Sequence, residues 1–216
     1  KLADALIFGI DGLTKLWRKE VFEGEFLRVL ELAYSQDFGL GIYMIDADKF
    51  KNVNDTYGHA VGDMVLQRIA SSCKGTLRPT DFIGRYGGEE IIACALLTSR
   101  DPTAEFNRID VMYRLGERIR KGVSDLEIEV GSLENGPVKV TPTVSIGCVC
   151  FPDHVPSDLL DYFFESGVAN DVRHLRLQEL AGDLQKAADS ALYVAKQKGR
   201  NRTVSHKDIP LAASSR

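Results

Sequence analysis

The stretch Arg85-Tyr-Gly-Gly-Glu-Glu-Ile91 joins two apolar runs, residues 81–86 and 91–97. A glycine pair between two strand-like runs predicts a tight β-hairpin, because the favoured turns need positive φ angles that glycine adopts without steric cost. Two carboxylates, Glu89 and Glu90, follow this turn directly. Neighbours on a strand point to opposite faces, so we expect at most one of them to share a site with a carboxylate on an adjacent strand. The two charges either solvate the hairpin tip or belong to a site.

Size and composition restrict the classes of protein to consider. The chain has 216 residues, 44% of them hydrophobic and 27% charged, which is typical of a globular domain with a full core. A net charge of −4 argues against a nucleic-acid partner but leaves room for a nucleotide substrate. No apolar run approaches the roughly 20 residues of a membrane span, so we expect no membrane contact within this segment. Four cysteines in apolar segments favour reduced thiols and a cytoplasmic location, although a membrane anchor of the full-length protein would lie upstream.

A second acidic feature follows the continuous apolar run 39–45, which predicts a buried strand. Asp46 and Asp48 come directly after it, and their spacing predicts that they share a face. Carboxylates at the end of a buried strand are costly unless they are paired, bound to a cation or reach water.

The expected sheet brings Asp46 next to Glu89, and two converging carboxylates repel each other. Either a divalent cation or protonation of one acid resolves this repulsion. We favour Mg²⁺, which binds oxygen ligands and completes its shell with substrate phosphates. Cationic side chains suited to phosphate are also present: Lys51, Lys196 and Arg200.

The order of apolar runs and amphipathic segments predicts a βαββαβ sheet with an added helix at each end. Strands are expected at 39–45, 82–86, 91–97 and 138–150, and helices at 20–34, 60–77, 104–123 and 177–198. The predicted fold class is therefore α+β, with one antiparallel hairpin inside the sheet and helices on one face. Residues 1–10 are interpreted as the end of an upstream linker helix, 11–206 as the domain, about 152–176 as an insertion and 207–216 as a mobile tail.

Five stretches together resemble the GGDEF family of diguanylate cyclases, over roughly Asp11 to Val204. They are Asp11-Gly-Leu-Thr-Lys-Leu16, Ile45 to Asp63, Arg85 to Ile91, Thr143-Val-Ser-Ile-Gly147 and Ala188 to Arg202. Their order and spacing are specific, whereas Gly-Gly-Glu-Glu alone is not. The resemblance implies a palm-like fold similar to nucleotidyl cyclases and polymerases. It also implies condensation of two GTP molecules to cyclic di-GMP, with release of pyrophosphate, across a homodimer.

The resemblance assigns a role to several positions. Asp46, Glu89 and the backbone carbonyl of Ala47 match the family's Mg²⁺ ligands, with two ions per half-site and Mn²⁺ as an alternative. Glu90 is the candidate to assist deprotonation of the 3′-hydroxyl. Asn54 and Asp63 match guanine readers, in agreement with their hydrogen-bonding chemistry. Matches to phosphate contacts are Phe50, Lys51, Lys196 and Arg200, and Gly87 and Gly88 allow the nucleotide to approach the hairpin closely.

Arg78-Pro-Thr-Asp81 matches the family's R-x-x-D inhibitory site for cyclic di-GMP, and Arg118 with Arg114 matches secondary product contacts. The alternative for Arg78 is a solvated charge that the helix dipole favours. Two rival functions stay open at this point. One is a catalytically silent module that binds GTP or cyclic di-GMP, and the other is a synthase of a mixed cyclic dinucleotide.

Overall fold

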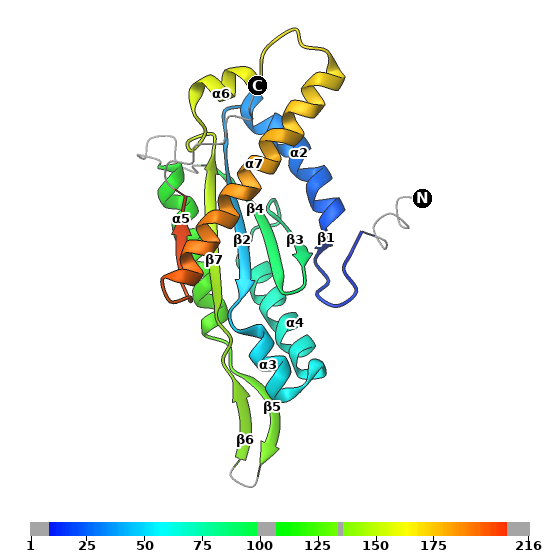
Figure 1. The fold of residues 1–216 in the computed structure, drawn as a ribbon, viewed down its shortest axis with the longest axis vertical. Coiled ribbons are helices and arrows are strands. Elements are labelled where there is room, and N and C mark those ends of the chain that lie inside the picture. Colours follow the sequence, from blue (N-terminus) through cyan, green and yellow to red (C-terminus); the bar gives the residue numbers. More distant parts are fainter. Residues whose placement is uncertain (1–8, 99–106, 134–135, 207–216) are drawn as a thin grey trace.

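A six-stranded mixed sheet organises the computed structural model, which describes residues 9–98, 107–133 and 136–206. The strand order is β1-β3-β4-β2-β7-β8 (Figure 1). Central β2 pairs antiparallel with both β4 and β7, while β1 and β8 are short parallel edge strands. The strands are β1 Trp17–Arg18, β2 Gly39–Ala47, β3 Phe82–Gly87, β4 Glu90–Leu97, β7 Val144–Phe151 and β8 Thr203–Ser205.

Helices cover both faces of this sheet. They are α2 Lys19–Ser35, α3 Phe50–Tyr57, α4 His59–Thr76, α5 Arg108–Ser124, α6 Ser157–Phe163 and α7 Asn170–Gln197. Ile42 and Met44 of β2 belong to a core shared with α2 and α7, whereas Tyr43 and Ile45 belong to a core shared with α4 and α5. The predicted α+β sheet with its internal hairpin is thus confirmed, and the expectation of helices on one face was wrong. All nine residues of β2 are buried because neighbouring side chains enter different cores.

Gly147 sets the distance between α7 and the sheet. A Cβ atom at this position would overlap the backbone of Ala188 and Leu192 on α7. Only glycine therefore lets the helix lie directly on β7, and this contact fixes where the last turn of α7 meets the end of β2.

Several boundaries differ from the sequence-based expectation. Residues 124–138, which lack a clear pattern, contain β5 Ile128–Leu133 and the start of β6 Gly136–Val140, a separate two-stranded ribbon (Figure 1). Helix α7 begins at Asn170 rather than Leu177, so the expected insertion at 152–176 contains α6 and the first turns of α7. The expected tail at 207–216, the residues 1–8 and the first residues of the helix expected at 104–123 lie outside the described ranges. Ile10, which was assigned to a linker helix, forms an isolated β-bridge with Trp17.

The four cysteines are free and buried, as expected. Burial raises the pKa of Cys73 to about 12, so this thiol stays protonated and unreactive at neutral pH. None of the described helices has the length and apolar character required to cross a membrane.

Candidate active site

The acidic cluster lies where the end of β2 meets the turn between β3 and β4. Gly87 pairs with Glu90, so Gly88 and Glu89 form a two-residue turn, and Gly88 has a φ of 42°. Glu89 therefore lies in the turn, and Glu90 is the first residue of β4. The prediction that Gly87 and Gly88 form the turn, with both acids on the strand, was wrong by one residue. A register shift between Arg85 and Gly87 takes one residue out of the pairing and moves the turn along the chain.

Asp46 is opposite Glu90 in the antiparallel ladder between β2 and β4. Directly opposed residues project from the same face of a sheet, so Glu90 is the cross-strand neighbour of Asp46. Burial raises the pKa of the Asp46 carboxyl, the bond from Lys196 lowers it, and the nearby charge of Glu89 raises it again. The ladder therefore places Glu90, rather than the expected Glu89, directly across from Asp46, while Glu89 lies in the turn and its charge still acts on Asp46.

The pKa of Glu90 is raised as well. Burial contributes most, followed by the negative charge of Asp46, and Asp189 on α7 adds to the effect. Asp189 was not among the residues singled out from the sequence. Its spacing of seven residues from Lys196 places both side chains on one face of α7, which was the available signal.

Lys196 provides the positive charge next to this cluster. Its Nζ lies 2.9 Å from Oδ2 of Asp46, whose side chain is only 12% exposed. Lys196 is in the last turn of α7, so the close packing at Gly147 helps to place the ammonium group at the end of β2. This ion pair links Asp46, a predicted metal ligand, to Lys196, a predicted phosphate contact. A positive charge on Asp46 offsets the repulsion between neighbouring carboxylates.

The arrangement fits a divalent cation. Within the described residues, no group of three or more His, Cys, Asp and Glu side chains could by itself hold a metal ion. Mg²⁺ often binds through one or two carboxylates and takes its other ligands from water and substrate phosphates. Asp46 and Glu89 could supply carboxylates of this kind together with the backbone carbonyl of Ala47, and the Lys196 ammonium lies on the carboxylate of Asp46.

The two expected guanine readers come together at the junction of α3 and α4. Gly58, with a φ of 84°, joins the two helices. The side-chain oxygen of Asn54 lies against Gly62, where a Cβ atom would overlap it. Asp63 follows Gly62 directly and is exposed, whereas Asn54 is half-buried, so both expected readers belong to the same helix junction.

The expected phosphate contacts come from the start of α3 and from the end of α7 with the loop that follows it. Phe50 and Lys51 begin this helix after Lys49, which has a φ of 54°. Lys51 and Arg200 are exposed and form no ion pair with any other described residue. A cavity of about 430 Å³ opens beside α3, between Phe50 and Arg200, and its lining includes neither Asp46 nor Asn54.

Comparison with known proteins assigns the family. A family model described as "Diguanylate cyclase, GGDEF domain" matches residues 9–162, more than half of the chain. The chain belongs to the GGDEF family. Diguanylate cyclase A of Treponema denticola is 37% identical to this GGDEF domain over 174 residues, which cover 80% of this chain and 37% of the relative. The chain spans little more than a third of the length of the first curated relatives it matches.

Solved GGDEF domains have the same fold. The domain of TpbB from Pseudomonas aeruginosa is 27% identical, with a TM-score of 0.69, and the match covers 92% of this chain and 94% of that one. The domain of DgcB from Caulobacter crescentus, in complex with c-di-GMP, is 26% identical, with a TM-score of 0.67 and coverage of 92% and 95%. These likenesses agree with the α+β palm-like fold predicted from the sequence.

The expected inhibitory residues of the GGDEF domain lie near the end of α4. The carboxylate of Asp81 accepts hydrogen bonds from the backbone N–H groups of Arg78, at 2.8 Å, and Leu96, at 3.1 Å. The Arg78 side chain is exposed and forms no ion pair with the described residues. Arg118 on α5 donates a hydrogen bond to the carbonyl of Thr76 at 2.9 Å. Arg118 therefore contacts the chain two residues before Arg78. Arg114 is exposed and donates to a carbonyl of its own helix.

Proposed function

We propose that this domain is a diguanylate cyclase, which condenses two GTP molecules into cyclic di-GMP and releases pyrophosphate. One observation carries the proposal: in a GGDEF domain, Asp46, Glu89 and Glu90 lie around the end of β2 with the Lys196 ammonium on Asp46. Relatives named as diguanylate cyclases support it.

Asp46, Glu89 and the Ala47 carbonyl would hold Mg²⁺, with two ions per half-site and Mn²⁺ as an alternative. The metal would lower the cost of ionising the 3′-hydroxyl and stabilise charge on the α-phosphate. Glu90, whose raised pKa suits a proton acceptor, would take the hydroxyl proton.

The remaining side chains would bind and orient the substrate. Asn54 and Asp63 offer acceptors for the guanine N1–H and N2–H groups and a donor for its carbonyl. Lys51, Lys196 and Arg200 would hold the triphosphate, and Phe50 would support the turn beneath it. The open backbone at Gly87 and Gly88 leaves room for the nucleotide at the hairpin.

The reaction requires two domains. Each 3′-oxygen forms a bond to the α-phosphorus of the opposing GTP, and the bond from that phosphorus to the bridging oxygen breaks. Two pyrophosphates therefore leave for each cyclic di-GMP formed. Since one domain has one such site, we propose that the active species is a homodimer with the two sites facing each other.

We further propose that the product inhibits the enzyme at Arg78 and Asp81, with Arg118 and Arg114 as secondary contacts. The Arg78 side chain is exposed and forms no ion pair with the described residues, which supports this, because a guanidinium can bind guanine edges and phosphates in bidentate fashion. GTP as substrate and four free cysteines support a cytoplasmic location for this domain.

Turnover assays with GTP and ATP, each with Mg²⁺, test the proposed function. We expect pyrophosphate and cyclic di-GMP from GTP alone, and a large loss of rate in Glu89→Gln, which removes a metal ligand. Equal use of ATP would point to a mixed cyclic dinucleotide synthase. Binding of GTP without turnover at high protein concentration would contradict the enzyme and favour a silent binding module.

A further inference from the structure

The loop between α7 and β8 carries Arg200 in an unusual backbone conformation. Arg200 and Asn201 are consecutive residues with φ angles of 64° and 43°, in the left-handed region that residues other than glycine rarely adopt. Such a conformation persists only where the surrounding structure holds it, and it is often found at functional sites. The bonds that hold this loop therefore matter for where the Arg200 side chain points.

The first anchor is the carboxylate of Asp48, just beyond the end of β2. Its Oδ2 accepts from the backbone N–H of Asn201 at 3.0 Å. The same carboxylate accepts from the hydroxyls of Thr143, at 2.8 Å, and Ser145, at 2.6 Å. Ser145 is opposite Asp46 in the ladder between β2 and β7, so Asp48 makes this bond on the face of the sheet that carries Asp46, as expected, although β2 itself ends at Ala47. Asp48 joins the loop to the start of β7.

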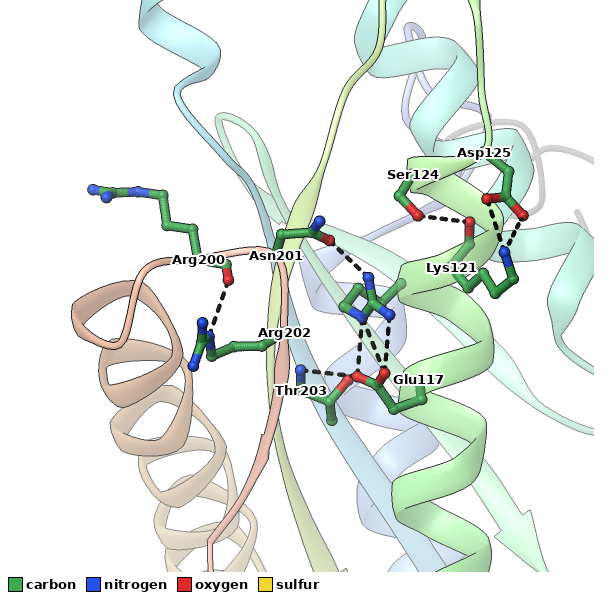
Figure 2. A network of polar contacts seen from close by, with 9 residues as sticks. Glu117, Lys121, Ser124, Asp125, Arg200, Asn201, Arg202 and Thr203 are labelled. Carbon is green, nitrogen blue, oxygen red and sulfur yellow. Dashed lines mark hydrogen bonds and ion pairs between the residues drawn. The ribbon is translucent and has the colours of Figure 1, made fainter.

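The second anchor comes from α5. The side-chain oxygen of Asn201 accepts from Nη1 of Arg120 at 2.8 Å. Three hydrogen bonds of 3.0 to 3.1 Å hold the Arg120 guanidinium on Glu117. Glu117 also accepts from the backbone N–H of Thr203 at 3.1 Å (Figure 2). The Glu117–Arg120 pair is therefore hydrogen-bonded to the residues on both sides of Arg202.

Arg200 takes no part in these side-chain contacts. Figure 2 shows its side chain extending away from α5, on the side opposite the Glu117 cluster. We propose that Asn201, held between Asp48 and the Glu117–Arg120 pair, is a positioning residue that directs the Arg200 guanidinium toward the triphosphate of the substrate. This inference rests on the proposed function, in which Arg200 binds a nucleoside triphosphate.

Fixing the loop in advance lowers the entropy lost when Arg200 binds its ligand, so the anchors should affect triphosphate affinity specifically. A purely structural role would lower stability and leave the preference for phosphates unchanged. The useful quantity is therefore a ratio, the affinity for 3′-deoxy-GTP divided by the affinity for 3′-deoxyguanosine. Both probes lack the attacking hydroxyl and cannot react, and both present the same base.

Arg120→Met is the main test, measured by calorimetry and by competition in the presence of Mg²⁺. We expect the affinity ratio to fall roughly fivefold to thirtyfold, the effect of losing one charge-assisted anchor. Asn201→Gly keeps the backbone donor and adopts the positive φ freely, but it loses the side-chain acceptor, so it should act in the same direction. Lys121→Met is the matched control and should leave the ratio unchanged, because Lys121 pairs with Asp125 and lies apart from the contacts of Asn201 (Figure 2).

A double-mutant cycle separates positioning from other effects. On an Arg200→Ala background, Arg120→Met should cause no further loss of the ratio. An unchanged ratio in both Arg120→Met and Asn201→Gly, or an equal loss on the Arg200→Ala background, would overturn the inference alone. A wild-type protein that binds 3′-deoxy-GTP no more tightly than the nucleoside would overturn the proposed function and the inference with it.

Discussion

Replacing Lys196 by Met tests whether the acidic cluster depends on a cation. The substitution keeps the length of the side chain and removes the ammonium that lies 2.9 Å from Asp46. Asp46 is 12% exposed and Lys196 32% exposed, so water screens the pair only in part. A hydrogen bond to a charged group is worth about 1.5–3 kcal/mol, below the roughly 3–5 kcal/mol of a fully buried pair. We therefore expect the free energy of unfolding to fall by about 1.5–3 kcal/mol at pH 7 in metal-free buffer.

Denaturant unfolding in the presence of EDTA measures this change, and in a domain of this size it corresponds to a loss of about 3–12 °C in Tm. Lys186→Met is the matched control on the same helix, because its partner Asp183 is 12% exposed, like Asp46, whereas the Lys186 side chain is 80% exposed. An ion pair with a solvated cation contributes about 0–1 kcal/mol. An equal loss in the two variants would refute the reasoning.

Adding Mn²⁺ completes the test. A divalent cation bound at Asp46 would replace the missing ammonium, and ligand binding to the folded state alone stabilises it. We expect Mn²⁺ to raise the Tm of Lys196→Met by more than it raises that of the wild type. A smaller gain in the variant would mean that Lys196 does not stand in for a cation.

Three further changes test separate parts of the structure. Glu90→Gln should become progressively more stable than the wild type as the pH rises above about 4.5 in metal-free buffer. The reason is that the folded protein raises the pKa of Glu90 and so destabilises its charged form. Denaturation measured over this pH range would give parallel curves for the two proteins if Glu90 were fully solvated. Gly147→Ala should lower stability by at least about 1–3 kcal/mol, since its methyl group overlaps the backbone of α7, and an unchanged Tm would contradict that packing. Arg78→Ala should relieve inhibition by added cyclic di-GMP, and inhibition curves identical to those of the wild type would place the product site elsewhere.

The strand core was predictable because its sequence signals are local. The continuous apolar run of β2 and the glycines between β3 and β4 predicted the central strand and its neighbouring hairpin. The same run also indicated that helices cover both faces of the sheet, because a strand without polar alternation is buried on both sides. The prediction of helices on one face overlooked this signal. The exact turn was not predictable, because the register shift between Arg85 and Gly87 depends on pairing rather than on composition.

The site was predictable in its residues but not in its connections. The Asp46 and Glu89 region was expected from the strand order, whereas the role of Asp48 was not. Its partners Thr143, Ser145 and Asn201 are 95 to 153 residues away in the chain, so no local pattern links them. In the sequence, Glu117 and Arg120 have the spacing of an ordinary helical ion pair. Only the structure shows that Arg120 also donates a hydrogen bond to Asn201 in the α7–β8 loop.

Product analysis of the protein with GTP and Mg²⁺ tests the central claim most directly. Mass spectrometry should identify cyclic di-GMP as the product, and a parallel phosphate assay should give two pyrophosphates for each molecule formed. Asp46→Asn, which removes a proposed metal ligand, should abolish both signals while the protein stays folded. Absence of cyclic di-GMP from the wild type at protein concentrations high enough for dimerisation, or equal turnover in Asp46→Asn, would contradict the account.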